Sequence, residues 1–197
     1  ATFGTMSRSV FANHCRSAAM ARESPSDHSA LTRMASSLAE EYLAMDPDGF
    51  ARYVEVAAKI PAEYHMGETP FTSGIVNKNN VLAYHLDVGN TLDGYSAMMV
   101  VRERSSGGML VIPEYNVTLD LQDGDVSIFD GQHTCHGVTP VELGLGGYRT
   151  SVVYFTLRSA WRCLPWSAEL AKAKALATRK ARESARKIRC SCVGGHT

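Results

Sequence analysis

Hydrophobic and polar positions follow two different rhythms along this chain of 197 residues. Up to about Pro61, apolar side chains recur three or four positions apart, the spacing of one face of a helix. The repeat first runs through Leu31, Met34, Leu38, Tyr42 and Leu43. It resumes after an Asp-Pro-Asp-Gly break, through Phe50, Tyr53, Val54, Ala57 and Ile60. The pattern predicts that residues 1–61 form a helical buttress whose apolar face packs on another layer.

From Phe71 onwards the rhythm changes to short β-like runs separated by polar or glycine-rich loops. The clearest runs are 95–102, 109–112, 117–121, 126–129 and 150–157. Many short strands at such intervals are typical of a sandwich or barrel and not of a parallel α/β sheet. We therefore expect a mainly β fold with N-terminal helices. Residues 71–158 would form a double-stranded β-helix, or jelly-roll barrel, within one domain spanning 1–197.

A basic, alanine-rich segment extends from Ser167 to Arg189. It holds eight Lys or Arg residues against two Glu, whereas the whole chain carries 20 charges of each sign. This composition predicts a C-terminal helix over 167–189 with a cationic surface. A solvated terminal helix and a phosphate-binding helix both fit, so the charge permits a nucleic-acid partner without establishing one.

The cysteines, the first residues and the length of the apolar runs bear on where the protein is located. The five cysteines are odd in number and unevenly spaced, at Cys15, Cys135, Cys163, Cys190 and Cys192. They favour free thiols in a reducing compartment, and a zinc site from Cys190, Cys192 and His196 is a weaker alternative. The first residues lack the pattern of a secretory signal. The longest apolar stretch, near 97–101, is far shorter than the roughly 20 residues of a membrane span, so no membrane partner is expected.

The residues that carry chemistry begin with His85 and Asp87. Residues i and i+2 of a strand point to the same face, so both side chains can reach one metal. His136, from a distant strand, completes a set of two histidines and one carboxylate that leaves coordination positions open, as Fe(II) oxygenases require. His133 is the alternative third ligand. We prefer His136 because the following residues 137–140 read as the exit of a strand.

A potential anion site follows on the last clear strand. Arg149 lies thirteen positions beyond His136, and Ser151 shares its strand face. The guanidinium fork suits a carboxylate, and the hydroxyl adds a further donor. A buried arginine is unfavourable unless it meets an anion. The far carboxylate of 2-oxoglutarate would be that anion, while its 2-oxo acid end and dioxygen would fill the open iron positions.

Together these motifs resemble the TET/JBP family of nucleic-acid-modifying dioxygenases. The resemblance covers roughly residues 71–157 well and the N-terminal helices only loosely. It rests on Phe71-Thr-Ser-Gly-Ile-Val-Asn77, His85-Leu-Asp87-Val-Gly-Asn90, Gly107-Gly-Met-Leu-Val-Ile-Pro113, Gly124-Asp-Val-Ser-Ile-Phe-Asp130, His136-Gly-Val-Thr-Pro140 and Arg149-Thr-Ser151. It implies Fe(II) as cofactor, 2-oxoglutarate and dioxygen as co-substrates, and DNA as substrate. The location that we expect is an intracellular, reducing compartment, and the nucleus in a eukaryote.

Family members flip a pyrimidine out of the duplex and oxidise its 5-methyl group, on 5-methylcytosine in TET-like enzymes and thymine in JBP-like ones. The resemblance implies the same reaction here, and we expect 5-methylcytosine rather than thymine. It further implies that Asn90 contacts the flipped base, although Gly89-Asn90 reads equally well as a turn. Leu157 stands where TET-like members carry a base-contacting histidine. That departure leaves the choice of base open.

Two other functions stay open at this stage. A 2-oxoglutarate oxygenase of the same design could hydroxylate a protein or a small molecule. A non-catalytic barrel could bind nucleic acid or a metal without turnover, and iron and co-substrate would then have no effect on its ligand.

Overall fold

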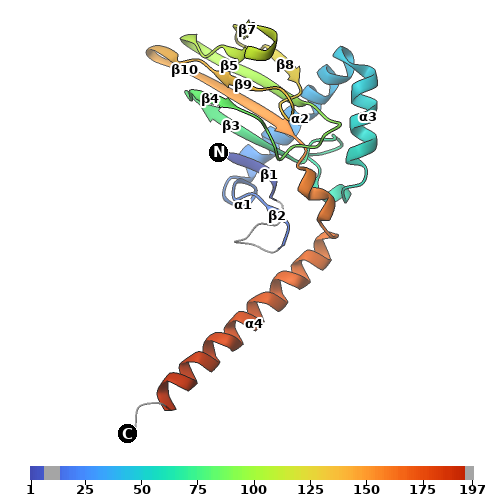
Figure 1. Ribbon diagram of the computed structural model, residues 1–197, viewed down its shortest axis with the longest axis vertical. Coiled ribbons are helices and arrows are strands. Elements are labelled where there is room, and N and C mark those ends of the chain that lie inside the picture. Colours follow the sequence, from blue (N-terminus) through green and yellow to red (C-terminus); the bar gives the residue numbers. More distant parts are fainter. Residues whose placement is uncertain (7–13, 194–197) are drawn as a thin grey trace.

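The structure is a computed structural model that describes residues 1–6 and 14–193, with side chains as far as residue 184 (Figure 1). Three helices lie in its N-terminal third: α1 (Met20–Glu23), α2 (Pro25–Met45) and α3 (Pro47–Ala57). A proline begins both α2 and α3, where its missing N–H would have no helical partner in any case. The Asp46 carboxylate caps α3 by accepting a hydrogen bond from the Gly49 N–H over 2.9 Å.

Two strands lie among the described residues before these helices, which corrects the prediction of a helical buttress over residues 1–61. β1 (Thr2–Met6) pairs antiparallel with β3 (Ser73–Lys78) and with the short β2 (Arg16–Ser17). A run of five residues is too short to show a helical or a strand period. Its conformation is decided by the hydrogen bonds that it makes to a distant strand.

Among the described residues, ten strands form two antiparallel sheets. The larger sheet has the order β2-β1-β3-β10-β5-β8, and the smaller has the order β4-β9-β6-β7. The remaining strands are β4 (Leu82–His85), β5 (Ser96–Gly107), β6 (Leu110–Ile112), β7 (Val117–Leu119), β8 (Val126–Phe129), β9 (His136–Val138) and β10 (Val141–Phe155). Short 3-10 helices are η1 (Ala62–Tyr64), η2 (Pro113–Tyr115) and η3 (Arg158–Arg162).

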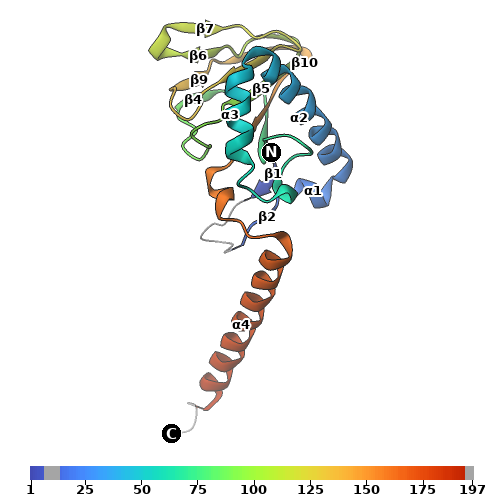
Figure 2. The same cartoon turned by 90° about the vertical axis from the view of Figure 1, so that its right-hand side faces the viewer.

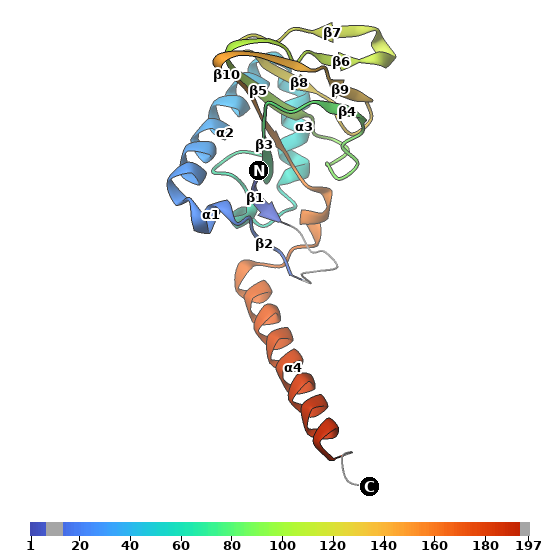
Figure 3. The ribbon, with the colours of Figure 1, turned by 90° about the vertical axis from the view of Figure 1, so that its left-hand side faces the viewer.

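The two faces of the larger sheet have different neighbours (Figures 2 and 3). On β10, Val152 and Tyr154 point toward α2 and α3, whereas Val153 and Phe155 point into a cavity beside the smaller sheet. The helix-side core contains Phe3, Ala35, Leu38, Ala39, Tyr42, Tyr53, Ala57, Met66, Phe71, Ala97, Val152 and Tyr154. Two facing antiparallel sheets with helices behind one of them confirm the predicted mainly β, jelly-roll fold.

The basic C-terminal segment forms α4 (Trp166–Val193), which projects away from the body of the protein (Figure 1). Its base is anchored by two acidic side chains. Glu63 accepts a hydrogen bond from the Trp166 N–H over 2.7 Å, and the buried Glu169 accepts from the N–H groups of Leu164 and Cys15 over 3.0 and 3.1 Å. No helix in the described ranges combines the length and apolar character needed to cross a membrane.

A disulfide joins Cys15 to Cys163, 148 positions apart, so the prediction of free thiols is wrong for this pair. Both cysteines are buried in a small core beside Ile60, Tyr64 and Ala160. Folding brings the start of β2 to the end of η3, a proximity that cysteine spacing does not reveal. The pairing also removes the cysteine argument for a reducing compartment.

The other cysteines are only partly described. Cys135 is a free, half-buried thiol, as predicted. Cys190 and Cys192 belong to the last turns of α4, where the side chains are not described. His196 lies outside the described residues, so the zinc alternative that joins these three side chains falls outside them as well.

Candidate active site

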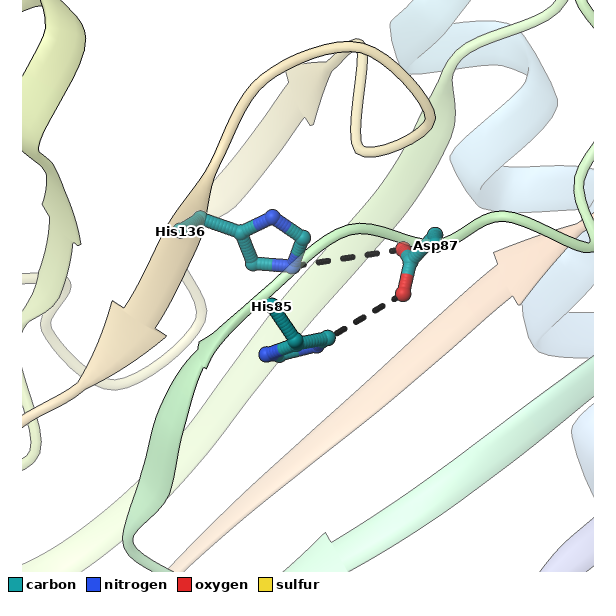
Figure 4. Close-up of side chains that lie close together, drawn as sticks. All are labelled: His85, Asp87 and His136. Atoms are coloured by element: carbon teal, nitrogen blue, oxygen red, sulfur yellow. Dashed lines mark ion pairs between the residues drawn. The ribbon is translucent and has the colours of Figure 1, made fainter.

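His85, Asp87 and His136 converge between neighbouring elements of the smaller sheet (Figure 4). His85 ends β4 and His136 begins β9, and the two residues are direct partners in this antiparallel pair. β4 ends two positions before Asp87, yet the Asp87 side chain still turns toward both imidazoles. Asp87 Oδ1 lies 3.6 Å from His85 Nε2, and Oδ2 lies 4.0 Å from His136 Nε2. The potential ligand atoms of all three residues lie within 4.8 Å of one another.

The two imidazoles are oriented by their backbone contacts. His85 Nδ1 donates a hydrogen bond to the Ala83 carbonyl, and His136 Nδ1 donates to the Thr134 carbonyl, each over 2.9 Å. A carbonyl oxygen accepts only, so the proton of each neutral ring resides on Nδ1. The Nε2 lone pairs are then directed toward Asp87 and are free to bind a metal.

The Asp87 carboxylate is held in a partly desolvated position. Burial raises the pKa of Asp87, and the neighbouring His136 and His85 counteract part of that rise. The Asp87 N–H donates to the Gly131 carbonyl over 2.7 Å, which fixes the loop that carries the carboxylate. A divalent cation would favour the ionised carboxylate here. Two imidazoles and one carboxylate are the donor set that suits Fe(II) with open positions.

Arg149 is almost fully buried on β10, with 2% of its surface exposed. Its Nε and Nη2 atoms have no hydrogen-bond partner among the described residues. Burial lowers the pKa of Arg149, and the nearby charge of Arg102 lowers it further. Space for the side chain comes from Gly108, where a β-carbon would lie 2.4 Å from Arg149 Cδ. Unpartnered guanidinium nitrogens in a buried position fit an anionic ligand.

A cavity of about 160 Å³ separates the two sheets next to the metal-ligand candidates. Ser151 and Asn77, direct partners across β10 and β3, contribute polar groups to it. Its other walls are mainly apolar: Ile75, Leu82, Met98, Leu110, Phe129, Val138, Val153 and Phe155. Sequence reasoning did not single out Asn77 as a site residue. No strand was predicted there, so the only available signal was an amide directly after the apolar pair Ile75-Val76.

The remaining predicted residues occupy distinct places. His133 is outside the cluster; its exposed ring pairs with Asp130, Nδ1 to Oδ2, at 2.8 Å. Asn90 is buried, and its Nδ2 donates to Asp87 Oδ2 over 3.4 Å and to Ser96 Oγ over 3.1 Å. The backbone of Asn90 forms an antiparallel bridge with Leu157. Asn90 therefore lies against a metal-ligand candidate, and its contact with a base stays a prediction.

Comparison with known proteins agrees with this geometry. Residues 6–158 match the Tet_JBP family, described as the oxygenase domain of the 2OGFeDO superfamily. Thymine dioxygenase JBP1 of Leishmania infantum is 33% identical over 88 residues, 45% of this chain and 11% of the relative. The bifunctional helicase and thymine dioxygenase JBP2 of Trypanosoma brucei brucei is 34% identical over 99 residues, 50% of this chain and 9% of the relative. The matched region thus spans about a tenth of these relatives' length.

The fold is also found among solved structures. The structure of NgTET1 in complex with 5mC DNA superposes with a TM-score of 0.67 at 15% sequence identity, covering 87% of this chain and 67% of that one. This likeness shows the double-stranded β-helix architecture, and the family match covers well over half of the chain. The chain belongs to the TET/JBP family of the 2-oxoglutarate- and Fe(II)-dependent dioxygenase superfamily.

Proposed function

We propose that this protein is an Fe(II)- and 2-oxoglutarate-dependent dioxygenase that oxidises the 5-methyl group of a pyrimidine in DNA. The observation that carries the proposal is the convergence of His85, Asp87 and His136, with both Nε2 atoms turned to the carboxylate. Family membership supports the class of chemistry, and the matched relatives support the class of substrate because they are named thymine dioxygenases.

The protein's own groups would hold the metal and the co-substrate. Fe(II) would be held by the three clustered side chains, His85, Asp87 and His136. Arg149 would bind the far carboxylate of 2-oxoglutarate with its unpartnered Nε and Nη2, and Ser151 would add a hydroxyl donor from the cavity wall. When bound, iron and 2-oxoglutarate supply the oxidising power: dioxygen converts 2-oxoglutarate to succinate and carbon dioxide, and one oxygen atom goes to the methyl group.

The apolar walls of the cavity exclude water from the reacting centre. Low polarity around Asp87 strengthens its electrostatic contacts with bound groups. The cavity lies inside the barrel, so a base stacked in a duplex cannot reach it. The target nucleotide would therefore have to leave the stack, which takes on the order of a few kcal/mol.

The base is the open part of this proposal. Both 5-methylcytosine and thymine carry the reacting methyl group and differ at C4, where one has an amino group and the other a carbonyl. An amide such as that of Asn90 can donate or accept and so suits both. We keep 5-methylcytosine and thymine as the two candidates. The names of the matched relatives favour thymine, whereas the expectation from the sequence was 5-methylcytosine.

Mass spectrometry of digested nucleosides tests the proposal directly. The protein is incubated aerobically with Fe(II), 2-oxoglutarate, ascorbate and DNA that contains both bases. His136→Ala is the loss-of-metal variant. His133→Ala is its matched control, because His133 is an exposed histidine three positions away that lies outside the cluster. We expect an oxidised pyrimidine with the unaltered protein and His133→Ala, and none with His136→Ala.

Other outcomes separate the alternatives. Succinate formation without an oxidised base would retain the oxygenase chemistry and move the substrate to a protein or a small molecule. If protein shown to hold iron forms neither succinate nor an oxidised base, the non-catalytic nucleic-acid-binding barrel is the better account.

A further inference from the structure

A cationic surface lies directly beside the candidate active site, on η3. Arg158 and Arg162 are exposed, and together with Ser159 and Trp161 they line a surface hollow of about 480 Å³. Trp161 is 37% exposed, and the Lys59 ammonium lies 5.8 Å from the centre of its ring. We call Lys59, Arg158, Trp161 and Arg162 the η3 surface.

Backbone contacts tie the η3 surface to the loop that carries a metal-ligand candidate. The Arg158 N–H donates to the Gly89 carbonyl over 3.1 Å, and the residue before it, Leu157, bridges Asn90. Gly89 and Asn90 follow Asp87 by two and three positions. The surface therefore begins at the rim of the site, where the loop after Asp87 meets the end of the barrel.

The cations of the η3 surface have no acidic partner in the part of the chain that the structure describes. Within the ranges that the structure describes, no carboxylate forms an ion pair with Lys59, Arg158 or Arg162. Arg102 differs, because it pairs with Asp120 at 3.2 Å. The chain is formally neutral, so three unpaired cations in one place do not reflect a general excess of positive charge. Clustered, solvent-facing and unpaired cations are the electrostatic mark of a polyanion site.

We propose that the η3 surface binds the phosphodiester backbone of the DNA strand next to the target base. This inference rests on the proposed function, since a target base at the cavity places the flanking phosphates at its rim. Arginine suits phosphate because its planar fork donates two parallel hydrogen bonds. Trp161 positions the Lys59 ammonium by a cation–π contact. Contacts of this kind set the register and orientation of the duplex without reading its sequence.

The test compares two double variants that each remove two positive charges. Arg158→Gln/Arg162→Gln alters the η3 surface, and the Arg158 N–H that holds Gly89 is retained. Arg22→Gln/Arg33→Gln is the matched control, because these exposed arginines lie on α1 and α2, on the other side of the body from η3 (Figures 2 and 3). Binding of a fluorescently labelled DNA duplex is measured by anisotropy over a range of salt concentrations.

We expect the η3 variant to bind about tenfold or more weakly at low salt. The slope of log affinity against log salt should become shallower by about 1.8, because each lost phosphate contact removes roughly 0.9. The control variant should keep the affinity and slope of the unaltered protein. Succinate formation without DNA should be equal in all three proteins, since the η3 surface lies outside the iron and 2-oxoglutarate sites.

The two proposals fail in different ways. If the unaltered protein oxidises a base while the η3 variant keeps the affinity and slope of the control, the η3 surface is not a phosphate site. If no base is oxidised but the η3 variant loses affinity and slope, the surface inference holds and the proposed reaction is wrong.

Discussion

Gly131 lies so close to Asp87 that a β-carbon on Gly131 would come within 2.5 Å of Asp87 Oδ2 and 3.4 Å of His136 Cε1. The loop that leads into β9 thus folds directly over two of the three metal-ligand candidates. The Gly131 carbonyl also accepts the hydrogen bond from the Asp87 N–H. Only a residue without a side chain leaves the carboxylate in its observed place.

Gly131→Ala should therefore weaken metal binding. We expect Fe(II) affinity to fall about 10- to 100-fold, which is typical when a residue that orients a metal ligand is mutated. Anaerobic titration calorimetry with Fe(II), or with Co(II) as a spectroscopic substitute, measures the change. Gly89→Ala is the control, because its β-carbon would meet only Leu157 Cδ2 at 3.8 Å. Equal affinities in the two variants would show that the Gly131 contact does not position Asp87.

Arg149→Lys is expected to impair co-substrate binding while iron binding stays intact. Lysine retains the charge but loses the fork that can bind a carboxylate through two nitrogens. We expect the KM for 2-oxoglutarate to rise at least tenfold, which corresponds to about 1.4 kcal/mol. Succinate formation measured against 2-oxoglutarate concentration gives the value. Arg104→Lys is the control on the same β5–β10 pair, where the side chain is 60% exposed. A KM equal to that of the control would place the co-substrate elsewhere.

Asn90→Ala separates two roles of the same side chain. The amide donates to Asp87 Oδ2, so its loss should lower Fe(II) affinity about fivefold, on the basis of roughly 1 kcal/mol for one hydrogen bond. Ser96→Ala removes the other partner of Asn90 and keeps the donor to Asp87, so it should change iron binding less. Metal titration together with the KM for DNA distinguishes the roles. A raised KM for DNA with unchanged iron affinity would assign Asn90 to the base alone.

Loss of the Cys15–Cys163 disulfide should destabilise the protein. The bond closes a loop of 148 positions, and disulfides typically contribute about 2–4 kcal/mol. For a chain of this size that corresponds to a fall in Tm of roughly 5–15 °C. Differential scanning calorimetry of Cys15→Ser/Cys163→Ser measures the change, with the free thiol variant Cys135→Ser as control. If the double variant has the same Tm as the control, the disulfide does not stabilise the fold.

Local patterns were enough to predict several elements and residues. The helical repeat through Leu38 and Tyr42 corresponds to buried positions of α2, because a period of 3.6 residues places them on one face. The basic segment forms a helix for the similar reason that alanine, lysine and arginine favour that conformation. The residue types of the metal cluster were also readable, since an H-x-D pair near a strand end places two ligands within reach of one ion.

Long-range contacts were beyond the reach of these patterns. Nothing in the first six residues distinguishes a strand from a helix until β1 meets β3. The spacing of Cys15 and Cys163 likewise carries no information about their proximity. The sequence favoured His136 over His133 only through the residues that follow it, whereas the register of β9 against β4 places His136 opposite His85.

The sequence by itself determined which chemical groups this protein possesses and the alternation that places Arg149 and Ser151 on the inner face of one strand. Tertiary structure alone decided which of those groups meet, which are buried and which lack partners. That division has a physical cause. Strand and helix periods arise from local backbone geometry, whereas desolvation of Asp87, the unpartnered nitrogens of Arg149 and the exposure of the η3 surface depend on segments far apart in the chain.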